Sequence, residues 1–575
     1  MSIVSSSEPD VGEAPTVELS RSQPAVPAPI APLILMLLFA VALVCRVGGL
    51  NGAVTEDEDQ WMGRAGNFAA ALLSGDVART YQTGHPGVLP MWLITLSLGP
   101  QRTSELSSRG RADFVVTTLP QFLPDLAQAR VPFLVLGALL STVLAALVWR
   151  LLGMVPGLMA GALLITDPYW AAMSPIVGMD GLLAGFLGIS LVTLLLALSE
   201  PQLAAVWIAC SGLACGLAAL TKTSAAYWLP ALAAVVVAAR FTPLKKLPLP
   251  LGEGWGEGRS SSAVLEPSPQ PSPKGRGSLV ALLALWLVVA AAVYYALWPA
   301  MWMQPLQTLY RTLDFSARLG GAPHAPGNFL LGSTQEDPGP LFYPVAMAFR
   351  LGPATTVGLL ALLAFGSSRR FTRVTWLVLI AAGVFLLLLT VSPKKVDRYL
   401  MPLAPLLIIL AAIGAWSAFQ WLIRQSWSPS TLRLHPGGVA LGLTLLLAAL
   451  QVWPLVAAGR YPLAAYNPLF GGARMAERAI PVGWGEGLDD AAQIIEHMAG
   501  DAPVTTSIWF PLRVNFQAHM PGPVVTERQI NQADFFVDYI HARQRQHTPA
   551  QLQRRAPDAV VSIGGVDYAR IYRLR

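Results

Sequence analysis

The amino-acid sequence predicts an all-α polytopic membrane protein of about 11 transmembrane helices, followed by a small α/β domain. Hydrophobic residues make up 54% of the 575 residues and charged residues only 13%, and the mean hydropathy is positive. Soluble domains carry about 25% charged residues. Apolar runs of about 20 residues, the length that crosses a hydrocarbon core as a helix, recur along most of the chain. The bilayer is therefore the expected solvent.

The predicted transmembrane module occupies residues 31–459. Its spans lie near 31–50, 131–150, 153–172, 181–199, 203–220, 225–240, 279–298, 343–366, 374–391, 399–422 and 437–458. Several of them are short enough to require tilting or local thinning of the bilayer. Residues 88–100 are too short and too Pro-broken for a span, so we expect them to lie at the interface or to pack re-entrantly beside a site.

Two segments have compositions unlike the module. Residues 1–30 are polar and Pro-containing and lack the basic start of a cleavable signal peptide, so we expect a disordered cytoplasmic tail. The connection at 241–278 is rich in Gly, Pro and Ser and has no apolar periodicity, so it cannot bury a core. It is predicted to be a low-complexity cytoplasmic insertion without a catalytic role.

The hydrophobicity falls after residue 459. Short β-rich pieces alternate there with helical, charged segments, which predicts an extracytoplasmic α/β domain at 460–575. Its GWGEG motif at 483–487 is most simply a tight loop. A contribution of this motif to acceptor binding is an alternative hypothesis, based on its place after the last span.

Basic residues in the loops predict the orientation of the chain. Lys and Arg gather in 241–278 and in 369–373, and cytoplasmic loops carry such an excess. Counting spans from these loops places the N-terminus inside and places 51–130, 392–398 and everything after 459 outside. We expect a multi-pass protein of the cell inner (plasma) membrane, with its active site and C-terminus extracytoplasmic. The net charge of +6 fits this orientation better than nucleic-acid binding.

The outer side nevertheless carries basic residues in short loops, namely Lys222, Lys394, Lys395 and Arg398. Contact with lipid headgroups explains such residues in many membrane proteins. An anionic ligand held at the outer membrane surface is the other explanation. Both interpretations stay open on charge alone.

The first outer loop is the most informative stretch. The acids from Glu56 to Asp59 directly follow a transmembrane helix, and Trp61, Arg64 and Phe68 continue at helical spacing. A solvated helix start is one interpretation, because carboxylates favour a helix N-terminus. An acidic site at the membrane surface is the other.

The order of motifs favours the site. The first loop resembles the signature of family 39 glycosyltransferases, the protein-mannosyltransferase-like members of the GT-C superfamily, in Asp57-Glu58, Trp61, Arg64, Phe68, Gly75-Asp76, Thr80-Tyr81 and His85-Pro86-Gly87. Later landmarks follow in the same order, at Asp180, Lys222, Trp302, Pro305, Asp337-Pro338-Gly339 and KKVDRYLMPLAPLL of 394–407. The joint order over several hundred residues carries the resemblance, since no single motif is specific.

The resemblance implies a GT-C-like helical bundle that moves a sugar, usually mannose, from a polyprenyl phosphate to an acceptor at the outer face, with inversion. Asp57 would be the general base, and Glu58 would orient the acceptor or a neighbouring cation. A partly apolar interface raises the pKa of such a carboxylate, whereas a neighbouring cation lowers it. The register is supported by Trp61 and Arg64, which fall where the family pattern expects them.

The lipid phosphate is the leaving group, so stabilising its charge should contribute much of the catalysis. The candidates for binding the donor phosphate or the substrate are Arg64, His85, Asp180, Lys222, Lys394, Lys395 and Arg398. Arg398 is favoured because a guanidinium grips phosphate with two donors. Simpler alternatives are a turn held by Pro86 for His85, a helix cap for Asp180 and an ion pair with Asp397 for Arg398.

No cofactor is expected. Asp57 and Asp180 offer two oxygen ligands for a metal, but the protein-mannosyltransferase-like branch does not clearly need one. The expected partners are a polyprenyl-phosphate-linked sugar, membrane lipid and an acceptor that is a protein, a lipid or a glycan, and not nucleic acid. A transporter or flippase of lipid-linked glycans is the alternative function, although such proteins show repeated halves and this sequence has no internal repeat.

Overall fold

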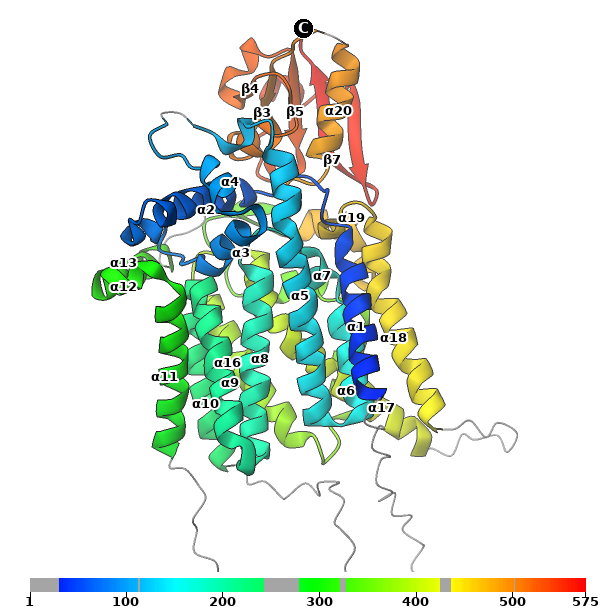
Figure 1. Cartoon of the computed structure of the whole chain (residues 1–575). Helices are drawn as coiled ribbons and strands as arrows, with labels where there is room; N and C mark the ends of the chain where they lie inside the picture. Colours follow the sequence, from blue (N-terminus) through cyan, green and yellow to red (C-terminus); the bar gives the residue numbers. More distant parts are fainter. Residues whose placement is uncertain (1–29, 112–113, 242–278, 321–326, 425–435, 501) are drawn as a thin grey trace, which may run out of the picture.

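The computed structural model describes residues 30–111, 114–241, 279–320, 327–424, 436–500 and 502–575. These residues form a bundle of long helices with a small mixed sheet at one end (Figure 1). The predicted tail at 1–30 lies outside the described residues except for Ile30, and the predicted insertion at 241–278 lies outside them except for Phe241.

Nine helical segments of the described part are long and apolar enough to cross a membrane. They contain α1 (Ile30–Val47), α5 (Phe122–Leu152), α8 (Asp180–Ser199), α9 (Ala204–Thr221), α10 (Trp228–Phe241), α11 (Leu279–Leu297), α16 (Thr372–Val391), α17 (Ala404–Arg424) and α18 (Pro436–Ala458). Short 3-10 turns extend three of them, namely η3 (Pro201–Leu203) before α9, η4 (Thr223–Tyr227) before α10 and η5 (Asp397–Leu403) before α17. The predicted polytopic helical fold is confirmed.

The predicted span at 153–172 is a broken element. It consists of α6 (Met154–Thr166) and the short α7 (Pro168–Met173). Between them, Asp167 accepts a hydrogen bond from the backbone N–H of Trp170 at 2.9 Å and starts the new helix. With 13 residues, α6 is about 20 Å long, shorter than the hydrocarbon core.

The predicted span at 343–366 is bent. It consists of α14 (Phe342–Arg350) and α15 (Pro353–Phe365), and the chain bends by 118° between them. Proline at the start of α15 lacks the N–H that a continuous helix requires. Counted as one span, this pair raises the number in the described chain to ten. Against α17, α15 packs so closely that a Cβ on Gly414 would lie 2.1 Å from the carbonyl oxygen of Gly358.

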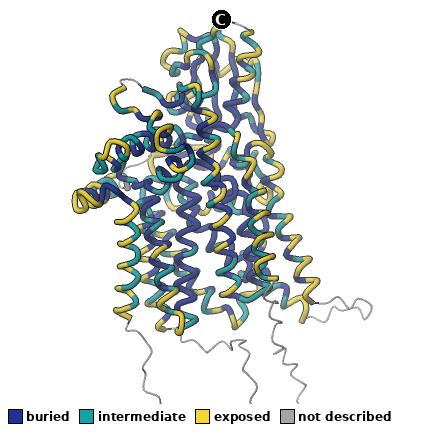
Figure 2. The backbone as a smooth tube through the Cα atoms, in the orientation of Figure 1, coloured by how far each residue is buried: buried dark blue, intermediate teal, exposed yellow. Residues whose placement is uncertain are grey.

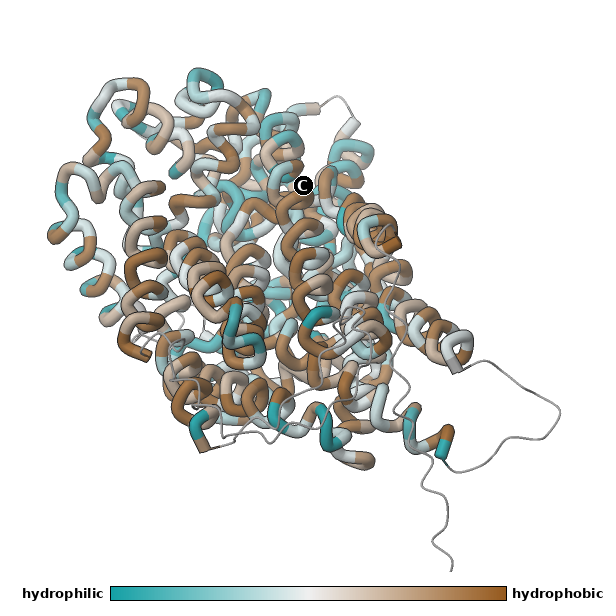
Figure 3. The backbone as a smooth tube through the Cα atoms, turned by 60° about the horizontal axis from the view of Figure 1, so that its bottom comes forward, coloured by the Kyte–Doolittle hydropathy of each residue, from teal (hydrophilic) through white to brown (hydrophobic). Residues whose placement is uncertain are grey.

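The helices differ in how far they are covered. In α8, 89% of the apolar window is buried, whereas in α11 none of it is, so α8 is central and α11 peripheral (Figure 2). Figure 3 shows that the long helices are mostly hydrophobic along their length. Many large apolar side chains of the peripheral helices are exposed. Apolar side chains on the outside of such a bundle face lipid.

One end of the bundle, here called the site end, carries both the first loop and the C-terminal sheet (Figure 1). The first loop contains α2 (Glu58–Leu73), η1 (Val77–Thr80), α3 (Val88–Leu98), α4 (Pro100–Glu105) and η2 (Val116–Thr118), and α12 (Pro299–Met303) and α13 (Pro305–Gly320) lie at the same end. Residues 51–130 and the region after 459 therefore share one end of the bundle, as the loop charges predict. With 11 residues, α3 is too short to span the membrane.

The C-terminal region is an α/β unit, as predicted. Its sheet has the strand order β4-β3-β5-β7-β6, in which β4, β3 and β5 are parallel and β7 and β6 are antiparallel. The strands are β3 (Thr506–Ile508), β4 (Val524–Thr526), β5 (Phe535–Tyr539), β6 (Ala559–Ile563) and β7 (Val566–Arg573). Helices α19 (Gly472–Ala479), α20 (Leu488–Ala499), α21 (Arg513–Gln517) and α22 (Ile540–Gln544) accompany them, and a separate hairpin pairs β1 (Asn328–Leu330) with β2 (Ser333–Gln335). The domain boundary at 460 stays a prediction.

Candidate active site

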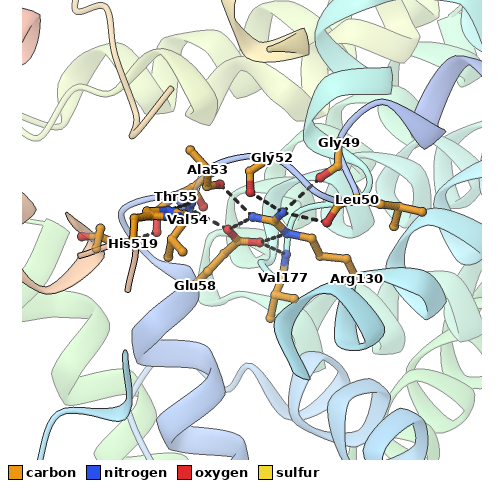
Figure 4. Close-up of polar contacts among 11 residues, drawn as sticks. Gly49, Leu50, Gly52, Ala53, Val54, Thr55, Glu58, Arg130, Val177 and His519 are labelled. Atoms are coloured by element: carbon orange, nitrogen blue, oxygen red, sulfur yellow. Dashed lines mark hydrogen bonds and ion pairs between the residues drawn. The ribbon is translucent and has the colours of Figure 1, made fainter. Parts of the chain in front are cut away.

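The segment that leads into α2 is held by Arg130, a residue of α5 that is 2% exposed (Figure 4). The Arg130 guanidinium donates to both carboxylate oxygens of Glu58, at 2.8 and 2.5 Å. It also donates to four backbone carbonyl oxygens at 2.9 to 3.1 Å, those of Gly49, Leu50, Gly52 and Ala53. Arg130 therefore holds the backbone between Gly49 and Ala53, shortly before Asp57.

Glu58 is fully buried, and its carboxylate is occupied. Besides Arg130, it accepts the backbone N–H of Thr55 at 2.9 Å and of Val177 at 3.0 Å (Figure 4). The sequence leaves two roles open for Glu58, and this geometry agrees with the second, in which Glu58 orients a neighbouring cation, here Arg130. Because all of these contacts are buried, the role proposed for Glu58 below is that of a positioning residue.

Asp57 occupies the N-cap position of α2, but its side chain forms no capping hydrogen bond with the backbone of this helix. The carboxylate, 31% exposed, forms an ion pair with Arg398 of η5. Burial raises the pKa of Asp57, but the charge of Arg398 and its hydrogen bond outweigh this and hold the pKa below its usual value. Asp57 is therefore a carboxylate at neutral pH, and of the two opposing effects expected from the sequence, the neighbouring cation prevails.

A second ion pair lies beside the first. Asp180, the first residue of α8, receives a hydrogen bond from the Lys222 ammonium at 2.6 Å, and both side chains are buried. The Nε of Arg398 lies 3.9 Å from the other oxygen of Asp180, so Arg398 connects the two pairs. The helix-cap interpretation of Asp180 is wrong, because Met179 occupies the N-cap position of α8.

The Arg398 guanidinium retains an unused donor. Its Nε is buried and has no hydrogen-bond partner in the described part of the chain. Its planar face lies over the ring of Trp484, 4.4 Å from the centroid. The alternative pair with Asp397 is not formed between side chains: the Asp397 carboxylate accepts the backbone N–H of Arg398 and pairs with Arg350 at 2.7 Å.

Two further cations act on the same centre. The charge of Arg64 lowers the pKa of Asp57, and Arg64 itself lies over the ring of Trp61 at 4.7 Å. Burial and the charges of Arg398 and Lys222 lower the pKa of Lys394. The two carboxylates Asp57 and Asp180 are thus surrounded by four cations, Arg64, Lys222, Lys394 and Arg398. This excess of positive charge suits an anionic ligand.

The other two acids of the first-loop run differ from Asp57. Burial and the neighbouring charge of Asp57 raise the pKa of Glu56 to about 7. Burial raises the pKa of Asp59 to about 7 as well. These two acids carry only part of a negative charge at neutral pH, so they offset the four cations only in part.

His85 lies at the edge of this centre. Its Nδ1 is 2.9 Å from the hydroxyl of Thr223, the residue after Lys222, and its ring contacts Phe315 of α13 edge-on at 5.1 Å. Burial and the charge of Lys222 lower the pKa of His85 to about 3. The imidazole is therefore neutral, and it can offer a hydrogen bond to a phosphate but no charge.

Lys395 is engaged away from the centre. Its side chain is fully buried and donates to Asp337 at 2.6 Å and to the carbonyl oxygen of Ser392 at 2.8 Å. Lys395, one of the predicted phosphate ligands, therefore connects its own loop with the loop that contains Asp337. Its direct neighbour Lys394 instead interacts electrostatically with the centre, where burial, Arg398 and Lys222 lower its pKa and Asp57 raises it.

Two residues of the site were missed from the sequence. Arg130 stands at the start of an apolar run, and a lone charge at that place in a membrane helix is a signal for a buried partner. Trp484 lies in the GWGEG motif, which the sequence analysis takes as a tight loop. Its contact with Arg398 joins segments far apart in the chain, and no local pattern predicts it.

Asp57 and Asp180, the two possible oxygen ligands, are paired with Arg398 and Lys222. Within the described ranges, His, Cys, Asp and Glu residues do not gather in threes as a metal site requires.

Comparisons with known proteins bear on the family. Residues 119–252 match the family model described as dolichyl-phosphate-mannose-protein mannosyltransferase. This stretch includes Arg130, Asp180 and Lys222. No curated protein matches the chain in sequence.

Several solved membrane proteins are similar at low identity. ArnT from Cupriavidus metallidurans bound to undecaprenyl phosphate is 16% identical, with a TM-score of 0.47 over 94% of this chain and 98% of that chain. AglB from Archaeoglobus fulgidus in complex with an inhibitory peptide and a dolichol-phosphate is 13% identical, with a TM-score of 0.41 over 89% of this chain and 69% of that chain. The S. cerevisiae Pmt1-Pmt2 complex bound to the sugar donor is 19% identical, with a TM-score of 0.32 over 48% and 34%.

The family match confirms the resemblance that the order of motifs predicts. The chain is a polytopic helical membrane protein, and its residues 119–252 are similar to the protein-mannosyltransferase family.

Proposed function

We propose that this protein transfers a sugar from a polyprenyl-phosphate donor to an acceptor hydroxyl at the site end of the bundle. The observation that carries this proposal is the pairing of Asp57 with Arg398, a guanidinium that also approaches Asp180 and keeps a buried, unused N–H. A polyprenyl donor keeps its tail in lipid and its phosphate at the interface. Lys222, Lys394 and Arg398 lie where the long helices end, which is the depth of such a phosphate, and Arg64 lies in the first-loop helix α2. Mannose is the first sugar to test, because the matching family model is named for it.

In this reaction Asp57 is the general base. It accepts the proton of the acceptor hydroxyl as the hydroxyl oxygen forms a bond to the anomeric carbon of the sugar. The bond between that carbon and the phosphate oxygen breaks, and its electron pair leaves with the polyprenyl phosphate. Attack opposite the leaving group inverts the anomeric configuration. Asp57 then returns the proton to water.

Arg398 links the leaving group to the base. Before the donor binds, the charge of Arg398 keeps the Asp57 carboxylate a weak base. When its free N–H groups bind the donor phosphate, the guanidinium charge is shared, and the pKa of Asp57 rises. Lys222 and Lys394 add charge stabilisation for the departing phosphate, and neutral His85 adds a hydrogen bond. Glu58 and Lys395 serve as positioning residues through Arg130 and Asp337.

We further propose that the site end is extracytoplasmic and that the chain lies in the plasma membrane. The support is the distribution of basic loop residues, which the positive-inside rule assigns to the opposite side. The acceptor class, whether protein, lipid or glycan, is the part of the reaction that must be identified by experiment.

The test uses membranes that contain the full chain and radiolabelled polyprenyl-phosphate mannose. Wild-type membranes should move the label into an acceptor fraction and release polyprenyl phosphate. Asp57→Asn at equal abundance should lower this rate by about 100- to 10,000-fold, the range for loss of a general base. The matched control is Glu105→Gln, which removes an exposed acid at the end of α4 and should leave the rate unchanged. Equal transfer by wild type and Asp57→Asn would contradict the assignment of the base. Silence of the wild type with a panel of polyprenyl-linked sugars would contradict the function.

A further inference from the structure

The segment before Asp57 is held from two sides. Arg130 of the bundle holds one side, as described above. On the other side lie residues of the C-terminal region: Asn515 of α21 donates from its side-chain amide to the carbonyl oxygen of Thr55 at 2.8 Å. The backbone N–H of Val54 donates to Nε2 of His519 at 3.3 Å (Figure 4). These contacts join positions 460 and 465 residues apart in the chain.

The burial of Asn515 and the neutral state of His519 are consistent with these two hydrogen bonds. Asn515 is 2% exposed, so its amide is committed to a buried partner. Burial lowers the pKa of His519 to about 4, and the neutral ring leaves Nε2 able to accept a hydrogen bond. Next to them, the hydroxyl of Thr117 in the first loop donates to the carbonyl oxygen of Val514 at 2.8 Å. The C-terminal region is thus fastened to the first loop at three successive places.

The GWGEG loop reaches the same segment. Gly485 has a φ of +117°, and a Cβ on it would lie 2.3 Å from the carbonyl oxygen of Val54. The N–H of Gly485 donates to the Tyr539 hydroxyl at 3.0 Å, and this hydroxyl donates to the carbonyl oxygen of Glu486 at 3.0 Å. The loop is therefore rigid and lies directly against the first loop, and it places the Trp484 ring over Arg398 at 4.4 Å.

We propose that the C-terminal region completes the active site: Asn515 and His519 position Asp57 through the backbone of Val54 and Thr55, and Trp484 positions Arg398 through its ring. Both members of the central ion pair are then set by one region outside the membrane bundle. This proposal rests on the proposed function for its kinetic meaning, while the contacts themselves can be tested without any activity.

These contacts restrict the conformational freedom of Asp57 and of Arg398. Asp57 follows Thr55 by two residues, so the position of its side chain depends on the path of this backbone. Arg398 has four rotatable side-chain bonds, and a guanidinium stacked on an indole face loses most of that freedom. A displacement of a reacting group by about 1 Å from its productive position can lower the rate by about 100-fold.

The first test replaces Asn515 with leucine, which has a similar volume and no donor. Asn515→Leu should lower kcat by about 10- to 100-fold and leave the donor KM unchanged, because Asp57 acts in the chemical step. The matched control is Gln493→Leu, the same loss of an amide at an exposed site on α20. Its kinetics should equal those of the wild type.

The second test concerns Trp484. Trp484→Ala should raise the donor KM by at least about two- to fivefold, the change expected for an exposed cation–π contact, because this contact is partly buried, and it should lower kcat as well. Trp484→Phe keeps an aromatic face and should restore the donor KM. If the indole only supported the fold, Trp484→Ala would lower the amount of active protein but would not raise the donor KM. If Trp484→Ala does not accumulate in the membrane, the comparison of Trp484→Phe with Trp484→Leu serves instead.

Amide hydrogen exchange of the peptide that covers residues 50–58 separates this proposal from the proposed function. Exchange there should be faster in Asn515→Leu than in wild type and Gln493→Leu, while exchange within α5 stays unchanged. If this result appears but no donor is turned over by the wild type, the positioning contacts hold and the proposed function fails. Wild-type exchange and, where turnover is measurable, wild-type kinetics in Asn515→Leu and Trp484→Ala would overturn the inference.

Discussion

Asp57 and Arg398 stand 341 residues apart in the chain, and Arg398 lowers the pKa of Asp57. Because Arg398 holds the pKa of Asp57 below its usual value, the acid limb of the pH dependence of kcat/KM should lie at low pH in the wild type. In Arg398→Gln the burial effect remains without the cation. We expect the acid limb of its residual activity to move to higher pH. A limb at the same pH in both enzymes would show that another group titrates there.

Glu56 predicts a pH dependence of stability. In the folded chain its pKa is raised from 4.5 to about 7 by burial and by Asp57. Between these two pH values the unfolded chain binds fewer protons than the folded chain, so Glu56 makes stability fall as pH rises from about 4.5 to about 7. Glu56→Gln removes this contribution. The thermal midpoint of Glu56→Gln should therefore rise relative to wild type across that window and stay at a constant difference above pH 7. A difference independent of pH would exclude a raised pKa.

At the scale of elements, the buried pair of Arg130 and Glu58 connects α5 with the start of α2. Removing one partner of a buried ion pair leaves the other charge without compensation, which costs about 3–5 kcal/mol. Arg130→Leu also removes the donor of four carbonyl groups. We expect Arg130→Leu to lower the free energy of unfolding by at least this amount, and Arg130→Leu with Glu58→Leu to recover part of it. Equal stability of the single and the double variant, measured by thermal unfolding in nanodiscs, would contradict the buried-charge explanation.

The contact between α15 and α17 makes a second prediction for elements. A Cβ on Gly414 would lie 2.1 Å from the backbone of Gly358, so Gly414→Ala must push the two helices apart. Such overpacking costs about 1–3 kcal/mol. Gly383→Ala in α16 is the matched control, because a Cβ there meets no atom within 4 Å. Thermal unfolding should show a lower midpoint for Gly414→Ala only, and similar midpoints for both variants would place the helices further apart.

At the scale of the whole molecule, the first loop and the C-terminal sheet lie at one end of the bundle and the end of α17 lies at the other (Figure 1). If the site end is extracytoplasmic, Gln493→Cys on α20 should react with a membrane-impermeant maleimide in intact cells. Arg424→Cys, exposed at the end of α17, should react only after permeabilisation. The native cysteines Cys45, Cys210 and Cys215 lie in spans and serve as the background. The reverse pattern of labelling would invert the proposed orientation.

The sequence by itself determined nine of the eleven predicted spans in the described part of the chain, and which loops share an end of the bundle. Apolar run length decides whether a helix spans, and alternation of spans decides the side of each loop, so both are properties that can be read along one dimension. It also brought Asp57, Asp180, Lys222 and Arg398 into one list of candidates. The breaks at 167 and 351 were missed, because a buried helix start and a bend leave the hydropathy nearly unchanged.

Only the tertiary structure decided which of these charges meet. Hydrophobicity sets the depth of a residue in the bilayer, but the rotation of each helix about its axis depends on packing against its neighbours. For this reason the sequence could not separate Asp57, which faces Arg398, from Glu58, which turns to Arg130. Nor could it separate Lys394, which acts on the centre, from Lys395, which pairs with Asp337. Adjacent residues of one short run point in different directions, and only the surrounding helices and the C-terminal region determine which direction leads into the site.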